Sequence, residues 1–157
     1  MDLLKGEYNM KQTVYFQSEE GLTQLLKDYQ EIFDILDDLS QQLLRGVIST
    51  VDQYKEALNQ ATGAYGALEP LFAMSVAHKE NEELHFYVNM KRELEGKGEK
   101  VVAATLDKEA SASVANVRSI RNVLEGYVSV SEKIIITAQT QLKQLSADYK
   151  FKPQEQA

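Results

Sequence analysis

The chain has 157 residues, with 2 prolines, 8 glycines and no cysteine. The lack of cysteine excludes disulfides, thiolate catalysis and cysteine-ligated metal sites, and the scarcity of proline and glycine favours long helices over a β-fold rich in turns. The net charge of −7 argues against a general nucleic-acid binder, because phosphate contacts require positive charge.

Charge is divided unevenly along the sequence. Residues 1–96 hold 8 lysines and arginines against 17 acidic residues, a balance of −9, whereas residues 97–152 hold 9 against 6, a balance of +3. Only the second part has the sign that suits a phosphate backbone. Neither a signal-peptide-like stretch nor a run near the ~20 apolar residues of a membrane span is present, so we expect a cytoplasmic protein without a membrane contact.

The first predicted helix follows an N-terminal arm. Residues 1–17 have no clear period, and with the β-prone run at 13–16 they are expected to form either one short strand or a segment that docks on a neighbour. A helix is expected over about 19–45, with Ser18 as its N-cap and Gly46 at its end. Its apolar face is predicted to consist of Leu22, Leu25, Leu26, Tyr29, Ile32, Phe33, Leu36, Leu39, Leu43 and Leu44.

A second helix is predicted to open at a capping box formed by Thr50 and Gln53. Pro70 is expected to kink or break it near residues 66–69, because proline removes a helical hydrogen bond. The apolar pattern resumes at Leu84 and continues to Leu94. The apolar positions around this point keep a seven-residue rhythm, at Val51, Tyr54, Leu58, Ala61, Tyr65, Leu68 and Phe72.

The third predicted helix, over about 105–149, follows a glycine hinge at Gly96 and Gly98. Its apolar side chains recur at steps of three, four and seven, which places them on one face. They are Ala110, Val114, Val117, Leu124, Val128, Ile135, Ala138, Leu142, Leu145 and Tyr149. A helix on the order of 60 Å long is difficult to bury in one small domain, so we expect a homo-oligomer. The expected interface residues are Val117, Leu124, Val128, Ile135, Leu142 and Leu145.

Together these patterns predict an all-α fold. We expect three or four long amphipathic helices in an elongated, oligomeric hairpin or bundle, with one helical domain over 18–152 and a disordered tail over 153–157.

Catalytic motifs are missing from the sequence. It has no P-loop, no nucleotide-binding glycine signature and no G-x-S-x-G elbow. His78, Glu82 and His85 share one helical face and form half of a di-iron carboxylate motif, but no second copy exists. We interpret them as an exposed polar face, with a metal site as the alternative. We therefore expect no enzymatic activity, cofactor, metal or small-molecule substrate.

Two charged clusters allow more than one interpretation. Asp34, Asp37 and Asp38 form either a solvated face or an acidic patch that binds a partner protein. Arg118 and Arg121, with lysines beyond them, either pair with acids such as Glu125 or line a groove that follows a phosphate backbone.

Residues 97–150 carry a layout that resembles a known family. A glycine turn precedes Val101-Val102, and the helix that follows contains three short sequences. These are Asp107-Lys-Glu109, Glu125-Gly-Tyr127 and Ile134-Ile-Ile136-Thr-Ala-Gln139-x-x-Leu142-Lys143. This arrangement resembles the C-terminal half of the UvsY-type phage recombination mediators.

The resemblance implies a small all-helical protein that assembles into rings and binds single-stranded DNA. Such mediators help to load a recombinase onto strands covered by single-strand-binding protein. On that basis the residues expected to contact DNA phosphates are Lys91, Arg92, Lys97, Lys100, Arg118 and Arg121.

A protein–protein interaction module is the alternative. The balance of −9 over residues 1–96 favours it, because an acidic helical face can imitate a row of phosphates. In this interpretation the chain is a phage assembly factor or an inhibitor of a host nucleic-acid-binding protein.

Overall fold

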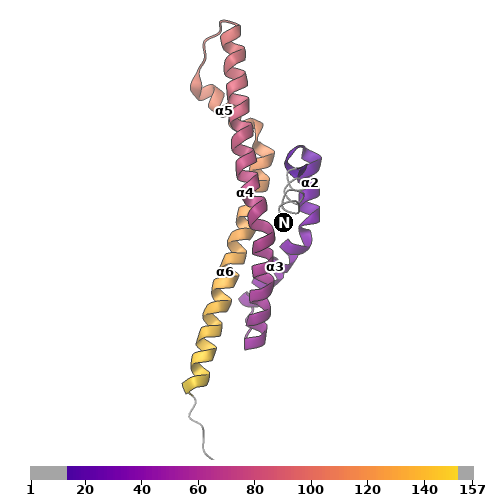
Figure 1. The fold of residues 1–157 in the computed structure, drawn as a ribbon, viewed down its shortest axis with the longest axis vertical. Coiled ribbons are helices and arrows are strands. Elements are labelled where there is room, and N and C mark those ends of the chain that lie inside the picture. The colour runs from indigo at the N-terminus through magenta and orange to yellow at the C-terminus, as the bar shows by residue number, and fades with distance from the viewer. Residues whose placement is uncertain (1–13, 152–157) are drawn as a thin grey trace, which may run out of the picture. The chain divides into compact units, whose positions relative to one another are not determined.

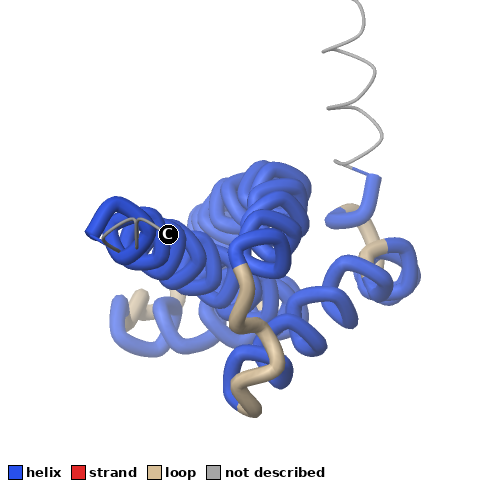
Figure 2. Tube along the Cα trace, turned by 90° about the horizontal axis from the view of Figure 1, so that it is seen from below, coloured by secondary structure: helices blue, strands red, loops and turns tan. Residues whose placement is uncertain are grey.

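The computed structural model describes residues 14–151, and within them it contains helices and loops but no strand (Figure 2). A 3₁₀ turn, η1 (Val14–Phe16), precedes α2 (Glu19–Asp28) and α3 (Gln30–Leu44). The remaining helices are α4 (Val51–Gly96), α5 (Ala103–Ser113) and α6 (Ala115–Phe151) (Figure 1). The prediction of an all-α fold is confirmed.

Two of the predicted helices are each divided by a single residue. Tyr29 separates α2 from α3, and Val114 separates α5 from α6. Both residues have ψ near zero, at 4° and 19°, which lies outside the α-helical region. A single non-helical residue barely changes the spacing of the apolar residues around it. The apolar periodicity of the sequence therefore continues across both breaks and does not reveal them.

The predicted helix ends are confirmed by hydrogen bonds. The amide of Gly21 donates to the Ser18 hydroxyl at 3.0 Å, and the Gln53 amide donates to Thr50 Oγ1 while Gln53 Oε1 accepts from the Thr50 amide. Gly46 and Gly98 each have a φ of +69°, the left-handed conformation that ends a helix at glycine.

Of the kink or break expected at Pro70, the break is wrong. α4 continues through Pro70 without interruption. The proline removes one hydrogen bond, to the carbonyl of Gly66, and Gly66 is exposed, so water can satisfy that oxygen. The short strand is also wrong within the described residues, since Val14–Phe16 form the 3₁₀ turn. Predictions for residues 1–13 and 153–157 lie outside the described residues.

The chain divides into two compact units. Within the described residues, unit 1 contains 14–28 and 70–125, and unit 2 contains 29–69 and 126–151. The core of unit 1 comprises Phe16, Leu22, Leu25, Leu71, Leu106, Ala110, Val114, Ile120 and Leu124. The core of unit 2 comprises Phe33, Leu36, Leu39, Ile48, Ala57, Ala61, Ala64, Leu68, Val128, Ile134 and Ala138.

The buried face of α4 is rotated from the expected one. Val51, Leu58, Tyr65 and Phe72 are half-buried at its margin. The buried positions are Ala57, Ala61, Ala64, Leu68, Leu71 and Ser75. Small side chains allow close approach to neighbouring elements, so the largest residues do not mark the centre of this face.

Among the described residues, no helix has the length and apolar character needed to cross a membrane.

Candidate functional site

The six basic residues expected to contact DNA all belong to unit 1. Lys91 and Arg92 lie near the end of α4, with Lys97 and Lys100 in the loop after it. Arg118 and Arg121 lie near the start of α6. The structure therefore brings the candidates into one unit, but most of them have acidic partners there.

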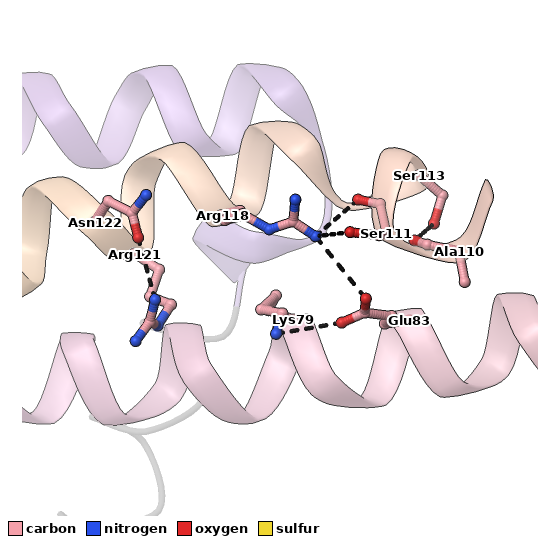
Figure 3. A network of polar contacts seen from close by, with 8 residues as sticks. All are labelled: Lys79, Glu83, Ala110, Ser111, Ser113, Arg118, Arg121 and Asn122. Carbon is pink, nitrogen blue, oxygen red and sulfur yellow. Dashed lines mark hydrogen bonds and ion pairs between the residues drawn. The ribbon is translucent and has the colours of Figure 1, made fainter. Parts of the chain in front are cut away.

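Arg118 holds three helices of unit 1 together (Figure 3). Its Nη2 donates to the backbone carbonyl of Ser111 at 2.9 Å and to the Ser111 hydroxyl, on α5. The same atom lies 3.8 Å from Oε1 of Glu83 on α4. Glu83 in turn pairs with Lys79 at 3.2 Å. These contacts give Arg118 a structural role.

Arg121 also has partners within unit 1. Its guanidinium lies 5.8 Å from the ring centroid of Phe72 on α4, a cation–π distance, and Nη2 lies 3.4 Å from Glu125. The sequence interpretation in which this arginine pairs with Glu125 is confirmed, and the contact with Phe72 is an addition to it.

The lysines on and after α4 form exposed ion pairs. Lys91 lies 3.9 Å from Glu95, and Lys97 donates a hydrogen bond to Glu93. This hydrogen bond, with the opposite charge, lowers the pKa of Glu93 and raises the pKa of Lys97. Exposed pairs contribute little stability, but each glutamate cancels much of its lysine's field. Arg92 and Lys100 are exposed and have no ion pair within the described part of the chain.

The six residues predicted to form the oligomer interface differ in how far they are buried within a single chain. Leu124 and Val128 are buried, which makes them core residues of a single chain. Val117, Ile135, Leu142 and Leu145 are half-buried. Ile136 is the most exposed large apolar residue among the side chains of α6 that the structure describes, at 62%. Homo-oligomerisation stays a prediction, and the apolar surface available for it is smaller than the sequence indicates.

Every charged side chain of α3 is acidic. The helix carries Glu31, Asp34, Asp37 and Asp38 and no basic residue. All four side chains are exposed. Glu31, Asp34 and Asp38 follow steps of three and four, so they form one row along the helix. Gln30 donates to Asp34 at 2.8 Å, and Gln42 donates to Asp38 at 2.5 Å. This surface, the acidic row, lies within unit 2.

Tyr127 fixes the remaining carboxylate of α3. Its hydroxyl donates to Asp37 Oδ2 at 3.0 Å, and its ring stacks on Phe33 with centroids 4.4 Å apart. Burial, and then the hydrogen bond to Asp37, raise the pKa of the Tyr127 phenol. Sequence reasoning missed this contact because 90 positions separate the two residues and no local pattern joins them.

Exposed apolar residues follow the acidic row. Leu44, the last residue of α3, is 80% exposed, and Val47 is 53% exposed. The predicted burial of Leu44 is wrong. Leu39 and the half-buried Leu43 occupy the inward face in the last turns of α3, which leaves Leu44 outside it.

The histidines line a cleft of about 450 Å³ in unit 1, together with Glu82. The His78 ring lies 5.7 Å from the ring of Phe16. Among the described residues, no three histidine, aspartate or glutamate side chains are arranged to hold a metal ion. The metal-site alternative therefore receives no support from the geometry.

No protein-family model matches the chain, and neither a curated protein nor a solved structure matches it.

Proposed function

We propose that this protein is a protein–protein interaction module whose acidic row on α3 binds a basic surface of a partner protein. The observation that carries the proposal is the contrast between the two sets of charges. Four of the six candidate DNA-binding residues pair with glutamates of the same chain, whereas α3 has four exposed carboxylates and no basic residue.

The chemistry of the surface supports a protein partner. Carboxylates spaced along one helical face attract lysine and arginine side chains, and they repel nucleic-acid phosphates. Leu44 and Val47 add exposed apolar area at the end of the same helix. A combination of charge and apolar contact is typical of protein interfaces. A host nucleic-acid-binding protein, whose own site is basic, is a partner of this kind.

The experiment compares affinity capture by three forms of the protein. The first is the natural sequence, and the second carries Glu31→Gln, Asp34→Asn and Asp38→Asn. The third, a matched control, carries Glu20→Gln, Glu99→Gln and Glu109→Gln at exposed positions outside α3. Both variants change the net charge from −7 to −4, since −7 + 3 = −4. Asparagine and glutamine retain the size of the original side chains.

We expect the natural and control forms to capture a basic protein and the α3 variant to lose it. Its affinity in a purified titration is expected to fall as salt rises, because the contact is electrostatic. Equal capture by all three forms would refute the role of the acidic row.

A second titration uses a fluorescein-labelled single-stranded oligothymidylate at low salt. We expect no binding at protein concentrations in the tens of micromolar. These lie within the range of about 1–100 μM where non-specific DNA binders associate at physiological salt, and at low salt such binders associate below that range. Saturable binding that is lost in an Arg92→Ala and Lys100→Ala double variant would favour the recombination-mediator hypothesis instead.

A further inference from the structure

Unit 1 contains a groove of about 630 Å³ between α4 and α5. Glu80, Glu83, Leu84 and Tyr87 line it from α4, and three residues of α5 line the other side. The groove is separate from the acidic row, because α3 belongs to unit 2.

The groove has an apolar patch, formed by Leu84, Tyr87 and Ala110. Leu84 is 62% exposed, which is high for a leucine within a long helix. Tyr87 is half-buried and Ala110 is buried. A large apolar side chain placed in this groove would remove Leu84 from water, and burial of apolar area favours association.

Each of the two helices that line the groove contributes an exposed carboxylate. Glu80 on α4 and Asp107 on α5 are exposed, and neither has an ion pair within the described residues. Among the residues that the structure describes, no lysine or arginine lines the groove. Glu83 differs, because Lys79 and Arg118 neutralise it. The apolar patch is therefore accompanied by one carboxylate on each helix, a pattern that disfavours anionic ligands and suits an apolar group that carries cations beside it.

Arg118 connects the two walls (Figure 3). It bonds to Ser111 on the α5 wall and lies 3.8 Å from Glu83 on the α4 wall. Arg118 thus bridges two residues that line the groove, Ser111 and Glu83, and this contact exists without a ligand; a preformed site loses less freedom on binding.

We propose that this groove binds a segment of a partner protein that presents a large apolar side chain flanked by lysine or arginine. The apolar side chain contacts Leu84 and Tyr87, and the cations approach Glu80 and Asp107. An amphipathic helix supplies such a pattern at steps of three and four residues. This second surface goes beyond the proposed function and does not depend on the acidic row.

The probe is a fluorescein-labelled amphipathic peptide built from leucine and lysine, measured by anisotropy against the full chain. Two reference peptides replace the lysines with glutamate or the leucines with alanine. Groove variants are Leu84→Ala and the pair Glu80→Gln with Asp107→Asn. The matched controls are Val123→Ala, another exposed apolar position, and the pair Glu20→Gln with Glu99→Gln. Circular dichroism verifies that each variant remains helical.

We expect the leucine–lysine peptide to bind and both groove variants to weaken it by about tenfold or more, with little change in the controls. Both reference peptides are expected to bind more weakly. Equal affinity for the natural protein and the Leu84→Ala variant would overturn the proposal.

Loss of peptide binding only in the α3 variant would also overturn the groove as a site, while leaving the acidic row intact as an interface. Conversely, if the capture experiment finds no partner for the acidic row, the peptide titration still tests the groove. The two proposals therefore fail separately.

Discussion

The ring of Phe33 stacks on the ring of Tyr127 with centroids 4.4 Å apart, and the same tyrosine donates a hydrogen bond to Asp37. This pair joins α3 to α6 within unit 2. It places a packing contact and a hydrogen bond on the helix that carries the acidic row.

Tyr127→Phe separates the two contributions of this residue. The substitution keeps the stacked ring and removes the hydroxyl, so we expect a loss of about 0.5–1.5 kcal/mol in the free energy of unfolding. Tyr127→Ala also removes the stack and is expected to cost more, about 3 kcal/mol. Urea unfolding followed by circular dichroism measures both. Equal losses in the two variants would mean that the stack contributes nothing.

Alkaline pH provides a second test of the same contact. Burial and the bond to Asp37 raise the pKa of Tyr127 from its ordinary value of 10.0. The folded state then holds the phenol proton more tightly than the unfolded state does. The stabilisation is complete below the ordinary pKa and disappears as the pH rises through the raised pKa.

We therefore expect the free energy of unfolding of the natural protein to fall above about pH 10 more steeply than that of Tyr127→Phe. The two proteins differ only in the Tyr127 hydroxyl, so the difference between the two curves isolates this group. Parallel curves would contradict the prediction.

Gly21 is required by the close approach of η1 to α2. A Cβ at this position would lie 2.6 Å from the carbonyl oxygen of Tyr15 and 2.9 Å from that of Val14. We expect Gly21→Ala to lower the free energy of unfolding by about 1–3 kcal/mol, because the backbone has to shift. Thermal unfolding measures the change.

Gly63→Ala is the matched control for Gly21→Ala. Gly63 lies inside α4, and a Cβ added there would meet no neighbouring atom within 4 Å. Alanine restricts the unfolded chain more than glycine does, so we expect Gly63→Ala to stabilise the protein by about 0.5–1 kcal/mol. The two alanine substitutions are thus expected to have opposite signs, and a common sign would refute the close approach at Gly21.

Local signals in the sequence were sufficient for the helical class and for the helix ends. Ser18, Gly46 and the pair Thr50–Gln53 act through neighbours in sequence, so their hydrogen bonds follow from spacing alone. The break at Val114 was not predictable in this way. It depends on one residue whose ψ departs from the helical value, and the apolar spacing continues across it.

The charged surfaces show the same division between local and distant contacts. Pairing of Arg121 with Glu125 follows from a spacing of four residues, and the sequence predicted it. The contacts of Arg118 with Glu83, and of Tyr127 with Asp37, join residues far apart in sequence. Spacing was therefore sufficient for the pairing of Arg121, whereas the contacts of Arg118 and Tyr127 required the fold.

Leu124 and Ile136 test how much of the apolar ridge belongs to the core of one chain. Leu124 is fully buried, whereas Ile136 is 62% exposed. We expect Leu124→Ala to lower the free energy of unfolding by about 2–5 kcal/mol, because a cavity replaces the leucine side chain. Ile136→Ala is expected to change it by less than about 0.5 kcal/mol.

Light scattering of the same two variants tests the predicted homo-oligomer. If copies associate through exposed apolar area, Ile136→Ala lowers the measured mass while leaving the helix content unchanged. A mass that changes with Leu124→Ala at full helix content would instead place Leu124 in an interface between copies.

Arg118 and Arg92 distinguish a structural arginine from a surface arginine in unit 1. Arg118 bonds to Ser111 and contacts Glu83, so we expect Arg118→Ala to lower the free energy of unfolding by about 1–2 kcal/mol. Arg92 is exposed, and Arg92→Ala is expected to change it by less than about 0.5 kcal/mol. Urea unfolding measures both values.

A DNA interface predicts a different pattern, in which both substitutions weaken oligothymidylate binding and neither alters the free energy of unfolding. That outcome would assign Arg118 to phosphate binding and would contradict its role in joining α4 to α5.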